Sequence, residues 1–287
     1  MQLRKWFVPL VIISTFSVGA VAQDGQSLVD SANAAYQSEQ YADCVDLYAS
    51  AIEQGADAPR VFYNAACCCA LSGDIDRAFQ HLDNAIGAGY HNSEWIREDS
   101  DLQDLRADDR WADLIKKADS ANEVYLNTIN RELYWLYRRD QDDRTGGNID
   151  WSQVAQRDSE RRGRVRQLLD SGYVTVSDDY YHAAMIFQHG DDTTDYKLAR
   201  ELALKAVELD STNGNAKWLS AAAKDRYLWN AGQPQWYGTQ YHMVDGKWTI
   251  EPIDTTAVND SIRREWEVPP LAEMRSRMAE LNGQGGE

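Results

Sequence analysis

The sequence is short of basic residues and lacks the motifs by which many enzymes are recognised. Its 46 acidic residues exceed its 29 lysines and arginines, which gives a formal charge of −17 at pH 7. A surface this acidic repels phosphate backbones, so nucleic acid is not expected as a partner. No HExxH, GxSxG or P-loop motif is present, and no GxGxxG follows an expected strand. Hydrolases that use a pair of carboxylates leave no such motif, so an enzyme is not excluded.

Long apolar runs are absent after residue 22, so no membrane span is expected in the mature chain. The first 22 residues join a basic start, Arg4 and Lys5, to an apolar run that ends in Ala20–Val21–Ala22. This pattern is typical of a secretory signal peptide, and an uncleaved anchor helix is the alternative. We expect cleavage and an exported protein, either periplasmic or secreted.

The sequence contains only four cysteines: Cys44, Cys67, Cys68 and Cys69. Export permits a disulfide, but four cysteines with three adjacent do not form a disulfide framework. They also lack the CxxC spacing of a zinc site. We therefore expect small buried helix residues and no metal or cofactor, while the redox state of the thiols stays open.

What the sequence does contain is a globular composition, 43% hydrophobic and 26% charged, and a length sufficient for two domains. Region 23–120 repeats itself, because the segment Leu28–Ala51 recurs 34 residues later. Small residues coincide: Ala32 maps to Ala66 and Cys44 to Ala78. Small side chains at this spacing let two antiparallel helices approach closely.

This repeat resembles the tetratricopeptide repeat (TPR) over about two copies, although Ala56 stands where that family usually has proline. The resemblance implies helix pairs that present a groove to a peptide or protein partner. A small platform that docks on the second domain is the alternative. The segment Asp99–Leu114, capped by Asp99 or Ser100, resembles the closing segment that covers the end of such repeats.

Region 121–282 shows mainly helical periodicity. We expect helices over 121–141, 151–169, 180–187, 194–209 and 216–229, a sixth from Asp254 or Thr255, and a last one over 271–281. Asp245–Gly246, flanked by alternating residues, predicts a β-hairpin near 240–251. Residues 283–287 are expected to form a flexible tail. The predicted fold class is mainly α: antiparallel TPR-like helix pairs followed by an α-helical domain with one small β-hairpin.

Polar residues at helix ends and in loops of this second domain form the candidate site. The candidate residues are Asp140, Gln141, Arg144, Gln188, His189, Asp225, Arg226, Tyr237, Thr239 and Gln240. Their motifs DQDDR, QH, DR and YGTQ, with VPPLAEM at 268–274, resemble the marks of an uncharacterised bacterial domain family. The resemblance covers roughly residues 125–280. It implies a shared site and specifies no chemistry.

Each candidate allows two interpretations. His189, at a helix C-terminus, could act as a general acid or base, or it could cap its own helix. Arg226 could bind a carboxylate or phosphate, whereas Asp225–Arg226 could instead be a buried ion pair that locks the helix against Asp140–Arg144. The loop Tyr237–Gln240 could orient a ligand or simply begin the hairpin.

Two further groups are ambiguous in the same way. Arg157, Arg161 and Arg164 share a helix face, which is either solvated or able to bind an anion. Aromatic residues surround the loop, and they form either a binding platform or a small core. The aromatic residues are Trp229, Trp236, Tyr241 and Trp248.

The sequence thus predicts an exported interaction or ligand-binding protein with a protein or peptide partner, or a small ligand. The alternative is a hydrolase-like enzyme in which His189 is the acid or base and Arg226, Tyr237 and Gln240 position the substrate. A purely structural protein of the cell envelope is the third hypothesis.

Overall fold

The computed structural model describes residues 19–145 and 148–284, with side chains from residue 25 to residue 283 apart from 146 and 147. The expected signal peptide and C-terminal tail lie largely outside these ranges. Within them, no helix combines the length and apolar character that a membrane crossing requires. The chain divides into two compact units, an N-terminal unit up to residue 128 and a C-terminal unit from residue 129.

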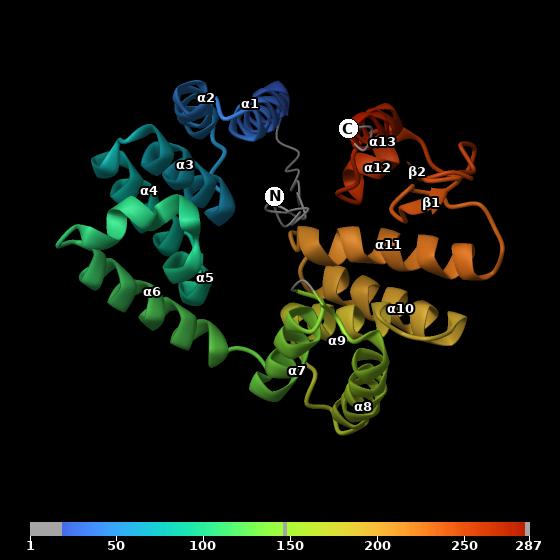
Figure 1. Cartoon of the computed structure of the whole chain (residues 1–287). Coiled ribbons are helices and arrows are strands. Elements are labelled where there is room, and N and C mark those ends of the chain that lie inside the picture. The colour runs from blue at the N-terminus through green and yellow to red at the C-terminus, as the bar shows by residue number, and fades with distance from the viewer. Residues whose placement is uncertain (1–18, 146–147, 285–287) are drawn as a thin grey trace. The chain divides into compact units, whose positions relative to one another are not determined.

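The described residues are mainly helical, with packed neighbouring helices and a single two-stranded antiparallel sheet (Figure 1). This confirms the predicted fold class. The helix Trp111–Leu126 runs across the domain boundary expected after residue 120. The division between the two units follows that helix instead of interrupting it.

The N-terminal unit consists of short helices packed in pairs, α1 with α2 and α3 with α4. Its elements are α1 (Gly19–Gln37), α2 (Tyr41–Glu53), α3 (Pro59–Ser72), α4 (Ile75–Gly87), α5 (Ser93–Glu98), the 3-10 helix η1 (Ser100–Ala107) and α6 (Trp111–Leu126). The bounds of α4 follow those of α2 at the expected spacing. Ala32, Cys44, Ala66 and Ala78 are all fully buried between the helices.

The cysteines lie in this helical core, as predicted, but two of them are paired. A disulfide joins Cys44 of α2 to Cys68 of α3, with Cα atoms 6.0 Å apart. Cys67 and Cys69 are free thiols and are buried. The pairing depends on the packing of α2 against α3, which the cysteine spacing does not reveal.

Asp99 begins the closing segment, as its sequence predicts. Its Oδ1 accepts a hydrogen bond of 3.0 Å from the amide of Asp101 and so caps η1. Leu102 and Leu105 of η1 are fully buried in the core of the N-terminal unit. The segment therefore covers apolar surface of the preceding helices.

The C-terminal unit stacks α9, α10 and α11 side by side, with α7 and α8 against α9 (Figure 1). Its elements are α7 (Arg131–Asp142), α8 (Trp151–Asp170), α9 (Ser177–Gln188), α10 (Thr193–Leu209), α11 (Gly214–Asn230), β1 (His242–Val244), β2 (Lys247–Thr249), α12 (Asp260–Glu265) and α13 (Leu271–Gln284). One apolar core includes Phe187 and Leu219, and a second one, with Tyr237, Ile250 and Met274, lies beside the hairpin.

Two helix boundaries differ from those expected. The predicted helix 121–141 is interrupted at residues 127–130, because Asn130 caps α7 through a 3.0 Å bond from the amide of Leu133. The sixth helix begins at Asp260 and not at 254 or 255, because Asn259 provides its cap. Asp254 instead closes a turn by accepting hydrogen bonds from Thr256.

The β-hairpin is confirmed. Met243 lies opposite Trp248, and Asp245 and Gly246 form the two-residue turn. Both turn residues have positive φ angles, 51° and 77°, the conformation that an Asp-Gly turn favours.

Candidate functional site

Asp140, at the end of α7, is the centre of a polar cluster in the C-terminal unit. Its carboxylate is fully buried. Oδ2 lies 2.7 Å from Nδ1 of His189 and accepts a 2.8 Å hydrogen bond from Gln141. Oδ1 accepts a bond of 3.1 Å from Arg144. The end of α7 is thereby joined to the end of α9.

Arg144 extends the cluster into a series of ion pairs between α7 and α8. Its guanidinium pairs with Asp158 at 2.5 Å, and Asp158 pairs in turn with Arg161 at 2.9 Å. Arg161 also bonds to Asp143, which pairs with Arg157 at 2.7 Å. The expectation of a solvated arginine face is therefore wrong for Arg161, which is buried. Arg164, the third member of that face, pairs with Glu132.

Asp143 gives this network a defined dependence on pH. Burial opposes its ionisation, but hydrogen bonds from Arg157 and Arg161 outweigh burial and lower its pKa below the ordinary value. The carboxylate therefore stabilises the fold above the ordinary aspartate pKa of about 3.9, and this contribution is lost as pH falls through the lower native value.

We expect Asp143→Asn to lower the free energy of unfolding at pH 7 and to have a smaller effect at pH 3. Below the ordinary aspartate pKa the unfolded chain binds a proton that the native Asp143 does not, so the stabilising contribution of this carboxylate shrinks as pH falls. Urea unfolding at both pH values measures this difference. A loss of stability that is equal at pH 3 and pH 7 would contradict the ion-pair assignment.

His189 directly follows the last residue of α9, Gln188. Its ring faces Asp140 and not a carbonyl of its own helix, so the self-capping alternative is wrong. The backbone carbonyl of His189 accepts a 3.2 Å bond from Arg162, which fixes the residue in place. With the proton on Nδ1, Nε2 is an acceptor, and it has no hydrogen-bond partner among the described residues. The side chain of His189 is 17% exposed.

Arg226 of α11 connects this cluster to the loop before the hairpin. Its Nη1 donates a 2.6 Å bond to the carbonyl of Gln188, and its Nε donates a 2.9 Å bond to Oε1 of Gln240. No carboxylate pairs with it among the described residues. Burial lowers its pKa, and the positive charge of Arg144 acts in the same direction. The expected Asp225–Arg226 ion pair is not formed between these two described side chains.

Asp225 has a different role, because it organises the loop. It is fully buried, and its two oxygens accept five hydrogen bonds of 2.8 to 3.0 Å. The donors are the amides of Trp236, Tyr237, Gly238 and Thr239 and the hydroxyl of Thr239. Gly238 has φ = +91°, and a Cβ there would lie 3.0 Å from Ile253. The loop is thus wrapped tightly around one carboxylate.

Residues 150–283 match a family of unknown function, DUF6624. The matched range begins after Arg144 and contains Gln188 to Gln240, so it includes His189, Arg226 and the Asp225 loop. The chain is also 33% identical over 69 residues to a chloroplast protein from Arabidopsis thaliana. That alignment covers 23% of this chain and 21% of the relative, so the chain spans about a fifth of the relative's length.

The DUF6624 range also contains two polar residues that sequence reasoning missed. Gln235 is fully buried, donates to the carbonyls of Gln240 and Ile250, and accepts from the amide of Gln240. Arg263 donates to the carbonyls of Tyr237 and Trp236. Neither residue belongs to a recognisable motif. Only the position of Gln235 between Pro234 and the YGTQ sequence hinted at a role in the loop.

The structure brings the candidate residues into one connected series. Most of them take part through polar side chains or a backbone carbonyl, and Tyr237 takes part only through its backbone amide. Asp140, His189, Gln188, Arg226 and Gln240 follow one another in contact. Thr239 joins this series through its hydroxyl, which accepts from Gln240 and donates to Asp225. Tyr237 enters only through its amide, because its ring lies in the apolar core.

Gln188 adds an unsatisfied group to this site. The residue is buried, and its Oε1 is enclosed without a hydrogen-bond donor among the described residues. An enclosed amide oxygen without a donor costs free energy, so a ligand or water that donates to it is favoured.

The aromatic residues near the hairpin are not a closed core. Trp229, Tyr241 and Trp248 are each more than one-third exposed, so the core alternative is wrong for these three. The ring of Trp229 lies 4.1 Å from that of His242, measured between centroids. Trp236 is partly buried and belongs with the core beside the hairpin.

The N-terminal unit contains a separate polar group, formed by Cys67, Asp99 and Asp101. Their ligand atoms lie within 4.8 Å of one another. Asp99 already accepts a bond of 2.5 Å from Tyr63, and Asp101 accepts one of 2.6 Å from Tyr36. Burial raises the pKa of Cys67, with the charges of Asp99 and Asp101 adding to it, so the sulfur is kept as a thiol. This group is a buried hydrogen-bond network.

Proposed function

We propose that the protein is an exported ligand-binding protein whose C-terminal unit binds a small polar molecule at His189 and Arg226. The ligand carries a carboxylate or phosphate group. The observation that carries this proposal is the largely buried guanidinium of Arg226, which has only neutral acceptors as partners among the described residues. Export is supported by the basic and apolar start of the sequence and by Ala20–Val21–Ala22.

The charge of Arg226 is unusual in its surroundings. The neighbouring Arg144, Arg157 and Arg161 all pair with carboxylates, in a chain with 46 acidic residues. A buried cation without a carboxylate carries a desolvation cost that an anion would offset. The guanidinium also offers its donors in a planar arrangement that suits a carboxylate or phosphate.

Two further groups would give such a site selectivity. Nε2 of His189 is able to accept a proton or a hydrogen bond, and Oε1 of Gln188 needs a donor. A ligand with a hydroxyl, amine or amide group beside its anionic group would satisfy both. Gln188 also supplies the backbone carbonyl that accepts a hydrogen bond from Arg226, and His189 is the next residue in the chain.

We expect Arg226→Gln to weaken ligand binding at least tenfold, since a charge-assisted hydrogen bond contributes about 1.5 to 3 kcal/mol. A panel of hydroxycarboxylates and phosphate monoesters, screened by thermal unfolding of the full chain, identifies the ligand, and calorimetry measures its affinity. Arg264→Gln is the matched control, because Arg264 is exposed on α12 and makes the same change of charge. An equal loss in both variants, or no stabilising compound, would contradict the proposal.

A hydrolytic enzyme is the second candidate, and it is favoured by the 2.7 Å contact between His189 and Asp140. A carboxylate at Nδ1 orients an imidazole and fixes its tautomer, which leaves Nε2 as a general base. Arg226 would then stabilise developing negative charge.

If the protein hydrolyses an ester or phosphoester, His189→Gln should lower kcat by about a hundredfold or more. Asp140→Asn should also lower kcat and alter the pH profile, because the ring loses its orienting carboxylate. Chromogenic ester and phosphoester substrates provide the assay. Hydrolysis that persists unchanged in His189→Gln would eliminate this candidate.

A protein or peptide partner is proposed for the N-terminal unit. The support is the TPR resemblance of its sequence and the packing of α1 with α2 and of α3 with α4. An open hollow of about 560 Å³ between the start of α4 and α2, lined by Val45, Asp46, Asp74 and Arg77 among others, is large enough for a few side chains of such a partner.

A further inference from the structure

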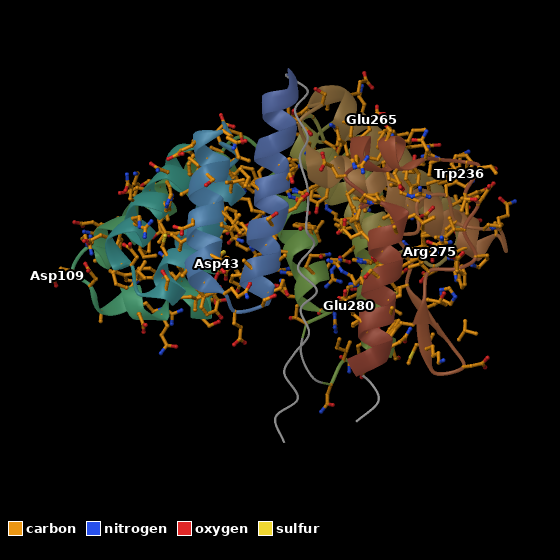
Figure 2. The ribbon with its side chains drawn as sticks, turned by 90° about the horizontal axis from the view of Figure 1, so that it is seen from above. Asp43, Asp109, Trp236, Glu265, Arg275 and Glu280 are labelled. Carbon is orange, nitrogen blue, oxygen red and sulfur yellow. A yellow bond between two sulfur atoms is a disulfide. The ribbon has the colours of Figure 1, made fainter. Side chains whose placement is uncertain are left out.

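The β-hairpin of the C-terminal unit has one edge that a side chain closes. Trp248 of β2 bonds through both of its backbone polar groups to Asn282 of α13. Its amide donates to Oδ1 at 2.7 Å, and its carbonyl accepts from Nδ2 at 2.9 Å. Figure 2 shows the hairpin beside α13, on which Arg275 and Glu280 are labelled. The side-chain amide of Asn282 therefore takes the place of a neighbouring strand on the β2 edge.

The other edge of the hairpin, formed by β1, is open at Met243. Met243 lies directly opposite Trp248. In an antiparallel pair, two opposite residues either exchange hydrogen bonds with each other or direct their backbone groups away from each other. Because the backbone groups of Trp248 point away to Asn282, those of Met243 point away from β2 on the opposite side. Neither the amide nor the carbonyl of Met243 has a hydrogen-bond partner among the described residues.

The side chains along the β1 edge are apolar and exposed to solvent. Met243 is 57% exposed and Val244 is 52% exposed, and the preceding Tyr241 is 41% exposed. The start of β1 is covered by Trp229, whose ring lies against that of His242. β1 contains neither lysine nor proline, the residues that commonly block an edge strand. An apolar edge of this kind is a template for pairing with another strand.

The distribution of charge favours a second copy of this chain as the source of that strand. The formal charge of −17 makes two copies repel each other over most of their surfaces. Residues 227–244 contain no charged residue and form the longest such stretch between residues 25 and 283. The β1 edge belongs to this stretch, so two copies approach each other there with the least repulsion. A two-stranded sheet is also marginally stable by itself, and self-pairing extends it to four strands.

We propose that two copies of the protein form a dimer by pairing their β1 strands antiparallel about a two-fold axis at Met243. Each Met243 amide then donates to the Met243 carbonyl of the other copy, with the two Cα atoms about 5.5 Å apart. The two Met243 side chains lie opposite each other on one face of the four-stranded sheet. The same patch serves both copies, as in most soluble homodimers. The dimer does not depend on the ligand proposed for His189 and Arg226.

Sedimentation of the full chain at concentrations from about 1 to 100 µM tests the proposal. We expect the wild type to reach twice the mass of one chain in this range. Met243→Lys and Met243→Glu should each raise the dissociation constant at least tenfold, because like charges then face each other across the axis. An equimolar mixture of the two variants should restore the dimer, since lysine then faces glutamate. Leu209→Lys, at an exposed apolar position of α10, is the matched control and should dimerise as the wild type does.

A wild type that stays monomeric at about 100 µM would overturn the proposal, even if another protein binds the β1 edge. Dimers that persist in both Met243 variants, or that are lost in Leu209→Lys as well, would place the contact elsewhere. Failure of the mixture to dimerise, with both variants folded by circular dichroism, would exclude a two-fold axis at Met243.

Hydrogen exchange of the wild type tests the same contact without a substitution. The Met243 amide should exchange slowly in the concentrated protein and freely in the dilute protein, because it is bonded only in the dimer. Equal exchange of this amide at both concentrations would contradict the pairing.

Discussion

Asp225→Asn should lower the free energy of unfolding by about 3 kcal/mol, because it leaves buried donors of the loop without an acceptor. The carboxylate accepts five hydrogen bonds, from four backbone amides and one hydroxyl. Asparagine keeps one acceptor oxygen and places an NH2 group against backbone N–H groups. Urea unfolding, followed by circular dichroism, measures the loss.

Asp170→Asn is the control for this substitution, since Asp170 is exposed at the end of α8. It should change the stability by less than about 0.5 kcal/mol. The Asp225 variant should also bind the ligand of Arg226 less tightly, because Thr239 and Gln240 lose their anchor. A cost below about 1 kcal/mol for Asp225→Asn would show that the loop does not depend on this carboxylate.

Loss of the Cys44–Cys68 disulfide should lower the free energy of unfolding by about 3 kcal/mol, since it frees a loop of 24 residues in the unfolded chain. The expected result holds both for reduction of the wild type and for the variant Cys44→Ala/Cys68→Ala. The cross-link joins α2 to α3, so the loss should appear in probes of the N-terminal unit. Denaturant unfolding with and without dithiothreitol measures it.

The double variant also supplies the control for this prediction. Dithiothreitol should destabilise the wild type and leave Cys44→Ala/Cys68→Ala unchanged, because the remaining Cys67 and Cys69 are free thiols in both proteins. A further effect of the reductant on the double variant would mean that another disulfide contributes. Equal stability of the oxidised and reduced wild type would contradict a stabilising role for the cross-link.

Local signals in the sequence were sufficient for most of the helices and for the hairpin. Asp150 caps α8 and Asp192 caps α10, and both aspartates precede helical periodicity in the sequence. The Asp245–Gly246 turn has positive φ angles that these residues adopt readily. Such features depend on contacts within a few residues. Where the expectation was wrong, a competing cap was responsible, as with Asn130 and Asn259.

The candidate site was foreseeable as a set of residues but not as a set of partners. Asp225 and Arg226 are neighbours in sequence, yet they point to different surroundings because successive residues on a helix differ by about 100°. Asp225 meets the amides of the loop, and Arg226 meets the carbonyl that ends α9. No local pattern in the sequence specifies which element Asp225 contacts and which element Arg226 contacts. No such pattern shows that Gln235 is enclosed either.

The sequence by itself determined the helical character, the hairpin turn, most of the helix starts and the polar residues worth testing. Each of these follows from propensities and periodicities that act over a few residues. The tertiary structure alone decided that His189 meets Asp140, that Arg226 meets neutral acceptors, and that Cys44 meets Cys68. The disulfide joins residues 24 positions apart and the His189–Asp140 contact joins residues 49 apart, so both depend on how whole helices pack.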